Sequence, residues 1–188
     1  MLSIFTLLLF GVAAVASIRR RSGWQIPLGL LLSAAGDAAG AMGWFVPQMG
    51  LFAAALGCYL CEMVPHIGRK RVRPAWPLAI LLPLVAGVAL LADHIEPIGE
   101  AVGVVLYALL LLSLVAAALL QQRPYRGWLL CAALLFLLSD ALIGYTRYVA
   151  PLHSSNRWIL LFYGTAQLLF ALWSITAPDK VPTKATSR

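Results

Sequence analysis

Charged residues are scarce in this sequence. Asp, Glu, Lys and Arg together make up 11% of the 188 residues, whereas 62% are hydrophobic. Soluble domains contain roughly 25% charged and 45–50% apolar residues. The scarcity of charge excludes an ordinary soluble domain and a disordered chain, and it favours a polytopic membrane protein.

Acidic residues are especially few. There are 7 Asp and Glu against 14 Lys and Arg, which gives a formal net charge of +7. A basic chain can bind nucleic acid, but here the cations form short clusters between apolar runs. Such clusters hold loops on the cytoplasmic side of a membrane. We therefore interpret the charge as a topology signal and expect no nucleic-acid partner.

Cysteine is also sparse. The 3 cysteines, Cys58, Cys61 and Cys131, lie inside apolar runs, so we expect small buried hydrophobic side chains and not a disulfide framework. Cys58, Glu62 and His66 follow one another at helical spacing, but one helix rarely supplies a complete metal site. The sequence therefore predicts no metal site, and we expect no cofactor.

No positive charge precedes the first apolar run, residues 2–18, and three arginines at 19–21 follow it. This order is the reverse of a secretory signal peptide, in which the charge comes first. We therefore expect the run to be a retained first helix with its N-terminus outside.

Long apolar runs fill most of the remaining sequence. A membrane-spanning helix needs about 20 mostly apolar residues, and stretches of suitable length recur along the chain. A bilayer offers the backbone no hydrogen-bond partners, and these runs lack the alternation of a barrel, so they should form helices. The predicted fold is an all-α integral membrane bundle of about seven helices. They cover residues 2–18, 25–45, 48–67, 77–92, 98–120, 128–150 and 158–177.

The basic clusters fit a seven-helix topology. With seven spans, the clusters at 19–21, 69–73 and 123–126 and the tail all lie on one side, whereas the opposite loops carry almost no cations. The positive-inside rule then places the N-terminus outside and the C-terminus inside. We expect one transmembrane domain, 1–177, a short polar cytoplasmic tail, 178–188, and a multi-pass location in the cell (inner) membrane.

Two aspartates lie deep inside apolar runs. A carboxylate at the bilayer centre costs at least ~2.5–3.5 kcal/mol on insertion scales, so it normally faces the bundle interior. Asp37 and Asp140 each lie about 12 residues, or roughly 18 Å, from the cytoplasmic start of their helices. Because both helices run in the same direction, we expect the two carboxyl groups to share one layer.

Further polar residues belong to the same region. Tyr163 and Gln167 lie at i and i+4 on one face of the last helix, at a similar height to the aspartates. Glu62 lies a turn or two lower in the third helix, and Arg147 lies two turns above Asp140. The sequence therefore predicts a buried polar pocket.

Three short motifs occur in order, each in a different expected helix. They are Ser33-x-x-Gly36-Asp37, Leu135-Phe136-x-x-Ser139-Asp140 and Tyr163-x-x-Ala166-Gln167. They resemble the S-x-x-G-D, L-F-x-x-S-D and Y-x-x-A-Q motifs of the YhhN family, the lysoplasmalogenases. Glu62 and Pro65 stand where that family has a His and a Tyr.

The resemblance implies hydrolysis of the vinyl-ether bond of a lysoplasmalogen to a fatty aldehyde and a glycerophospho-choline or -ethanolamine. Protonation of carbon gives an oxocarbenium ion that water captures, so the reaction needs a carboxylic acid and a negative group beside the cation. Two nearby carboxyl groups in low dielectric tend to hold one proton between them. We expect one of Asp37 and Asp140 to be the acid and the other to stabilise the cation; the assignment stays open.

The resemblance and the predicted pocket together suggest the residues that bind substrate. Tyr163 and Gln167 would orient the glycerol oxygens or the water, and Arg147 would meet the phosphate. The partner is an amphiphilic lysophospholipid, which would enter laterally from the bilayer. The predicted binding residues are Ser33, Glu62, Ser139, Tyr163, Gln167 and Arg147.

Other interpretations stay open at this stage. Intramembrane carboxylates also serve proton relays, so a small proton-coupled carrier or channel is the alternative function. A non-catalytic membrane partner is a third, in which the aspartates only hydrogen-bond neighbouring helices.

Overall fold

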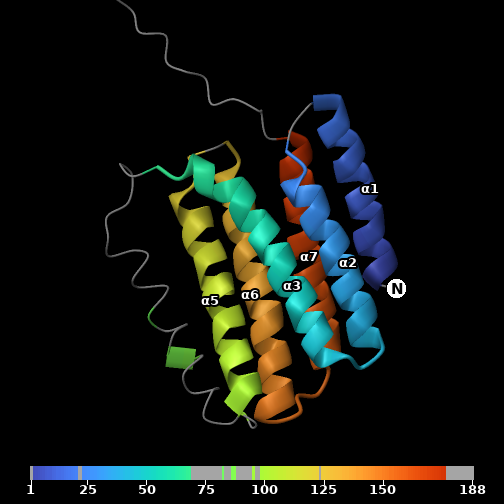
Figure 1. Cartoon of the computed structure of the whole chain (residues 1–188), viewed down its shortest axis with the longest axis vertical. Coiled ribbons are helices and arrows are strands. Elements are labelled where there is room, and N and C mark those ends of the chain that lie inside the picture. The colour runs from blue at the N-terminus through green and yellow to red at the C-terminus, as the bar shows by residue number, and fades with distance from the viewer. Residues whose placement is uncertain are drawn as a thin grey trace, which may run out of the picture.

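The computed structural model describes residues 2–20, 23–68, 98–122 and 124–176, together with 82, 86, 87 and 95. This part of the chain is all-helical (Figure 1). The expected tail, 178–188, and nearly all of the helix expected at 77–92 lie outside it. The helices are α1 (Leu2–Arg20), α2 (Gln25–Ala41), α3 (Phe45–Met63), the 3-10 helix η1 (Val64–His66), α5 (Ile98–Leu120), α6 (Arg126–Tyr148) and α7 (Ser155–Thr176).

The helix bounds follow the apolar runs closely. The prediction for α5 matches at both ends. Helix α2 ends sooner than expected, at Ala41, because Gly43 adopts a φ of +76° and turns the chain. Helix α3 consequently begins at Phe45, which places Pro47 in its first turn, where a missing N–H breaks no helical hydrogen bond.

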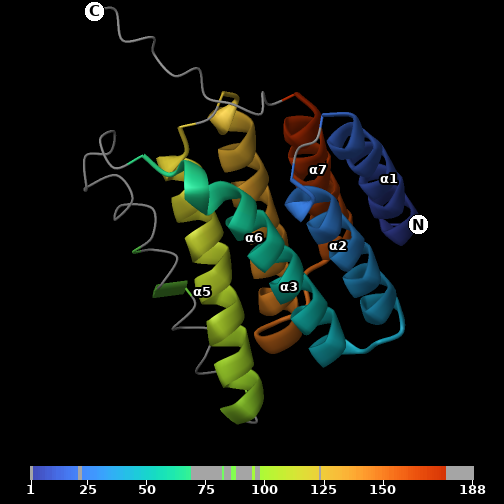
Figure 2. The ribbon, with the colours of Figure 1, turned by 45° about the horizontal axis from the view of Figure 1, so that its top comes forward.

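Six helices form a closed ring in the order α1, α2, α3, α5, α6, α7, and α7 packs back against α1. Helices α2 and α7 also touch across the ring. Figures 1 and 2 show these helices standing side by side as one bundle. Residues distant in sequence, on α1 and α7 for example, can therefore share the interior.

The C-terminal ends of α3 and α5 are joined by hydrogen bonds, so these two helices run parallel. Ile67 and Gln121 form an isolated antiparallel bridge, and Gly68 N–H donates to Leu120 O at 3.1 Å. The Gln121 side-chain Nε2 also donates to Met63 O at 3.2 Å. This pairing satisfies backbone groups at two helix ends that would otherwise lack partners.

The outer surface of the bundle is apolar. Four helices in the described ranges are long and apolar enough to cross a membrane, namely α3 extended to His66, α5, α6 and α7. Large hydrophobic side chains such as Leu8, Val46 and Leu106 are exposed on the outside. In water such a surface would aggregate, whereas in a bilayer it meets acyl chains. The chain is a multi-pass membrane protein.

The prediction that all three cysteines are buried is wrong. Cys61 and Cys131 are exposed and Cys58 is half-buried, and all three are free thiols. An apolar run does not distinguish the core from the lipid-facing side of a membrane helix, because both favour apolar residues.

Candidate active site

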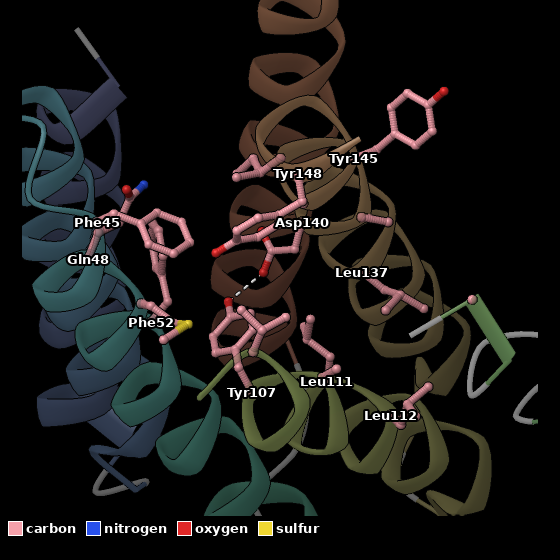
Figure 3. Close-up of a pocket in the computed structure, with 17 residues that line it drawn as sticks. Phe45, Gln48, Phe52, Tyr107, Leu111, Leu112, Leu137, Asp140, Tyr145 and Tyr148 are labelled. Atoms are coloured by element: carbon pink, nitrogen blue, oxygen red, sulfur yellow. Dashed lines mark hydrogen bonds between the residues drawn. The ribbon is translucent and has the colours of Figure 1, made fainter. Parts of the chain in front are cut away.

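A cavity of about 320 Å³ lies between α3, α5 and α6. Its walls are mostly apolar or aromatic, and Asp140 is the carboxyl residue among the residues that line it. Figure 3 shows Phe45 and Phe52 from α3 on one side, Tyr107 from α5 on another, and Asp140 from α6 between them. The cavity extends along α6 from Leu137 to Tyr148, about 16 Å at 1.5 Å per residue.

Asp140 is held in this cavity by Tyr107, whose hydroxyl donates a hydrogen bond to Asp140 Oδ2 (Figure 3). Both residues line the cavity. A carboxyl group in an apolar environment needs such a partner, because burying it without one costs several kcal/mol. Tyr107 therefore fixes the orientation of the carboxyl group toward whatever occupies the cavity.

Asp37 has different neighbours, on α1 and α7. The Thr6 hydroxyl donates to Asp37 Oδ2 at 3.0 Å, and the Tyr163 hydroxyl donates to the same oxygen at 3.1 Å. The predicted proximity of Asp37 and Tyr163 is confirmed. Three helices thus meet at the Asp37 carboxyl group.

A buried polar network continues from Asp37 toward α3. The Tyr163 hydroxyl also interacts with Gln167, and Gln167 Oε1 accepts a hydrogen bond of 2.7 Å from the Tyr59 hydroxyl. Tyr59 in turn interacts with Ser33. Ser33, Tyr59 and Gln167 are fully buried, so this network from α2, α3 and α7 lies inside an apolar bundle. Among the described residues, Ser33 Oγ and Gln167 Nε2 have no hydrogen-bond partner.

Three aromatic rings separate Asp37 from the cavity. Phe52, Phe136 and Tyr163 pack edge to face around one another, with centroids 5.6–6.2 Å apart. Phe52 lines the cavity, whereas Asp37 does not. The two carboxyl groups therefore have different surroundings, and the expectation that they share one layer stays a prediction.

The other predicted binding residues lie apart from the cavity walls. The Ser139 hydroxyl donates to Ile159 O at 3.3 Å and so joins α6 to α7. Glu62 lies beside the turn between α1 and α2, where a Cβ on Gly23 would be 2.9 Å from Glu62 Oε2. Neither residue is among those that line the cavity.

Arg147 lies at the end of the cavity, as its position above Asp140 predicts. Its Nη2 forms an ion pair with Glu100 Oε1 at 3.1 Å, and its guanidinium lies 3.7 Å from the centroid of the Phe45 ring. Glu100 also accepts a 2.5 Å hydrogen bond from the Tyr148 hydroxyl. Phe45 and Tyr148 both line the cavity.

Sequence reasoning missed three partners of the motif residues, Thr6, Tyr59 and Tyr107. Tyrosines near helix ends are usual interface anchors, but Tyr59 and Tyr107 lie well inside α3 and α5. Their depth was the available signal, because a Tyr hydroxyl deep in a membrane needs a hydrogen-bond partner. Nothing in the sequence around Thr6 distinguishes it from other small polar residues of membrane helices.

The donor set does not form a metal centre. In the parts of the chain that the structure describes, no group of three or more His, Cys, Asp and Glu lies close enough to hold a metal ion. The site is instead a carboxyl–tyrosine pair in an apolar cavity, backed by a second carboxyl group in a polar network. This arrangement can bind an amphiphile and move a proton, so the fold and site define a membrane-embedded protein with acid–base capacity.

Comparison with known proteins identifies the family. The model of the YhhN family matches residues 1–173, and the chain belongs to this family. It is 32% identical over 152 residues to lysoplasmalogenase TMEM86B of Homo sapiens, with 79% of this chain and 62% of that protein covered. It is 30% identical over 169 residues to lysoplasmalogenases of Mycobacterium bovis and Mycobacterium tuberculosis, with 86% of this chain and 64% of each relative covered.

The chain thus spans less than two thirds of the length of these relatives. No solved structure gives a significant match.

Proposed function

We propose that this protein hydrolyses the vinyl-ether bond of lysoplasmalogens to a fatty aldehyde and a glycerophospho-base. The observation that carries the proposal is the Asp140 carboxyl group, held by Tyr107 inside an apolar cavity within a bundle of membrane helices. Relatives at 30–32% identity are named lysoplasmalogenases. A lysoplasmalogen is a single-chain amphiphile, which suits a cavity with apolar walls and charged groups at one end.

The chemistry begins with a proton. Asp140 donates it to the β-carbon of the vinyl ether, and the C=C electron pair forms the new C–H bond and leaves an oxocarbenium ion. Water adds to the cationic carbon and returns a proton to the Asp140 carboxylate, which gives a hemiacetal. Collapse of the hemiacetal breaks the C–O bond and releases an aldehyde and the glycerol hydroxyl. Overall one water is consumed, and the acid is regenerated.

Asp37 supports this reaction from behind the aromatic rings. Its carboxyl group is fixed by Thr6 and Tyr163, and the Tyr163 ring packs against Phe52, which lines the cavity. A negative charge in a low-dielectric interior stabilises a cation that develops nearby. We therefore assign the acid to Asp140 and the electrostatic role to Asp37, with Tyr163 and Gln167 as positioning residues.

We also propose seven membrane crossings, with the N-terminus outside and the C-terminus inside, in one domain over 1–177. Helices α3 and α5 run parallel, and parallel helices that follow each other in a chain require another crossing between them. Arg126 lies at the end where α3 and α5 terminate, which supports that end as cytoplasmic. The cell membrane is the proposed location.

Aldehyde release from purified protein and lysoplasmenyl-ethanolamine tests the proposed activity. We expect turnover by the wild type, and a loss of at least ~100-fold in Asp140→Asn, because the amide has no carboxylic proton to transfer. Asp37→Asn should also lose activity, since the charge beside the cation is removed. Thermal unfolding and gel filtration show whether each variant is folded.

Ser113→Ala is a matched control. It removes a polar group from the exposed face of α5, where the Ser113 hydroxyl donates to Leu109 O of its own helix, so its activity should equal that of the wild type. Turnover retained in both aspartate variants would refute the mechanism, and a wild type that releases no aldehyde would refute the activity.

A further inference from the structure

The end of the cavity carries an ion pair enclosed by aromatic rings. Arg147 pairs with Glu100 at 3.1 Å, the guanidinium lies over Phe45, and the Phe45 and Tyr148 rings meet edge to face with centroids 6.3 Å apart. The side chains of Arg147 and Glu100 are 43% and 19% exposed. The pair is thus accessible from outside and adjoins the cavity through two of its lining residues.

Each member of the pair keeps capacity for a second partner. Among the described residues, the hydrogen bonds to Glu100 come from Arg147 Nε, Arg147 Nη2 and the Tyr148 hydroxyl, and all end on Oε1. A carboxylate accepts on both oxygens, so Oε2 can accept from a further donor. Arg147 donates to Glu100 through Nε and Nη2, and Nη1 can donate to an anion without breaking the pair.

We propose that Glu100 and Arg147 form the headgroup site and select a zwitterionic phospho-amine headgroup. The phosphate binds Arg147, and the ammonium binds Glu100 beside the rings of Phe45 and Tyr148. A headgroup with adjacent negative and positive charges can lie antiparallel to an ion pair, and aromatic faces attract ammonium cations. This inference rests on the proposed function, because it assumes a lysolipid in the cavity.

The spacing between the ion pair and Asp140 fits one lysolipid molecule. Arg147 follows Asp140 by two turns of α6, which is a rise of about 10.5 Å. Seven covalent bonds separate the β-carbon of the vinyl ether from the phosphorus, about 8 Å at the advance per bond of an extended chain. A lysolipid with its phosphate on Arg147 therefore brings its vinyl ether to the Asp140 carboxyl group, since side-chain reach covers the difference.

The Glu100–Arg147 site discriminates between lysolipid headgroups by repelling anionic ones as well as by attracting zwitterionic ones. Glu100 and Arg147 together are neutral, so a neutral zwitterion is matched at both charges. A glycerol phosphate headgroup without an amine is attracted by Arg147 but leaves Glu100 facing an anion, which is unfavourable. The pair thus predicts a preference for choline and ethanolamine lysolipids over anionic ones.

Binding of saturated alkyl-ether lysolipids tests the site separately from catalysis, because these probes have no vinyl ether to hydrolyse. The probes are 1-O-alkyl lysophosphocholine, the ethanolamine analogue and 1-O-alkyl glycerol 3-phosphate, measured against the purified full chain in detergent. We expect the wild type to bind the two zwitterionic probes at least ~5-fold more tightly than the phosphate, which corresponds to about 1 kcal/mol.

Substitutions of Glu100 and Arg147 test whether the two side chains recognise the headgroup or only stabilise the protein. Glu100→Gln should abolish the preference by weakening the zwitterionic probes and strengthening the phosphate, and Arg147→Gln should weaken all three. The ratio of two affinities within one variant does not depend on how much of the protein is folded. Arg157→Gln is the matched control, because it removes an exposed cation from the start of α7, at the same end of the bundle, and it should leave the ratio unchanged.

A charge swap, Glu100→Arg with Arg147→Glu, distinguishes an ion pair that only stabilises the fold from one that recognises the headgroup. The swap restores an ion pair but reverses its direction, so the zwitterion preference should stay lost. Wild-type preference in Glu100→Gln or in the swapped variant would overturn the proposal. If the probes bind with the expected pattern but lysoplasmalogen is not cleaved, the headgroup site stands and the proposed activity fails.

Discussion

Asp37 and Asp140 are the same residue type in helices that run in the same direction, yet they have different surroundings. Asp140 accepts a hydrogen bond from the Tyr107 hydroxyl and faces the open space of the cavity. Asp37 accepts hydrogen bonds from two helices and lies behind the Phe52, Phe136 and Tyr163 rings. At the scale of single residues, access to the cavity therefore distinguishes the two aspartates, because Asp140 lines it and Asp37 does not.

Tyr107→Phe tests how Asp140 is positioned. The substitution keeps the ring and removes the hydroxyl that donates to Asp140 Oδ2, so the carboxyl group loses its fixed orientation. We expect kcat for aldehyde release to fall by ~10–100-fold, because proton transfer depends on geometry. KM should change little, since the apolar wall is kept.

Tyr125→Phe is the control for this change. Tyr125 is exposed and lies at the start of α6, at the opposite end of this helix from Arg147. Its variant should retain wild-type kcat. A Tyr107→Phe enzyme with unchanged kcat would show that the hydrogen bond does not serve the reaction.

Helix α2 depends on small residues where it meets α3. Gly29 faces the Tyr59 ring, and a Cβ there would lie 2.2 Å from the ring. Gly36 faces Phe52, where a Cβ would lie 3.0 Å from the ring. In lipid, helices associate by close packing and not by a hydrophobic driving force, so such contacts hold the bundle together. At the scale of the element, two glycines allow two aromatic residues of α3 to reach the interior.

Gly29→Ala should therefore destabilise the protein by about 1–3 kcal/mol, the usual cost of overpacking. The displaced ring belongs to Tyr59, whose hydroxyl donates to Gln167, so the polar network should loosen as well. The midpoint of thermal unfolding in detergent measures the change.

Gly50→Ala provides the comparison within α3. A Cβ at Gly50 meets nothing within 4 Å, so helix propensity alone predicts a gain of about 0.5–1 kcal/mol. Equal effects of the two substitutions would show that the contact between Gly29 and Tyr59 is not tight.

The whole molecule is a ring of helices with an apolar outer surface and a divided interior. One part holds the cavity between α3, α5 and α6, and the other holds the polar network around Asp37 and Gln167. In the proposed function, a lipid that diffuses in the bilayer would reach the Asp140 carboxyl group from the side of this bundle. The route from membrane to site needs no water-filled path for the acyl chain.

The proposed topology predicts which loops face which side. In a variant whose native cysteines are replaced by Ala, Gln122→Cys lies between α5 and α6 and His153→Cys lies between α6 and α7, and both positions are exposed. A membrane-impermeant maleimide added to intact cells should label the His153→Cys variant and spare the Gln122→Cys variant, because the basic ends face the cytoplasm.

Opening the cells should expose the spared cysteine to the reagent. The reverse pattern in intact cells would invert the orientation. Labelling of both positions would exclude a crossing by α6.

The sequence predicted the candidate site in part. Counting residues from the cytoplasmic ends of the helices placed Asp37 and Tyr163 at a similar depth, and the hydrogen bond between them shows that they are neighbours. The partner of Asp140 was not predictable in this way, because Tyr107 belongs to a helix of almost uniform hydropathy that shows no preferred face. Glu62 was assigned to the pocket by its depth, but its direction around α3 points it to the turn between α1 and α2.

The sequence by itself determined that the described part of the chain forms apolar helices, approximately where they begin and end, and that polar groups are buried among several of them. These features are local, because hydropathy and backbone hydrogen bonding depend on residues close in the chain. Only the tertiary structure decided that α3, α5 and α6 enclose a cavity, that three aromatic rings separate the two aspartates, and that Glu100 meets Arg147. Those outcomes depend on the rotation of each helix about its axis and on its neighbours in the ring, which a nearly uniform apolar pattern leaves unspecified.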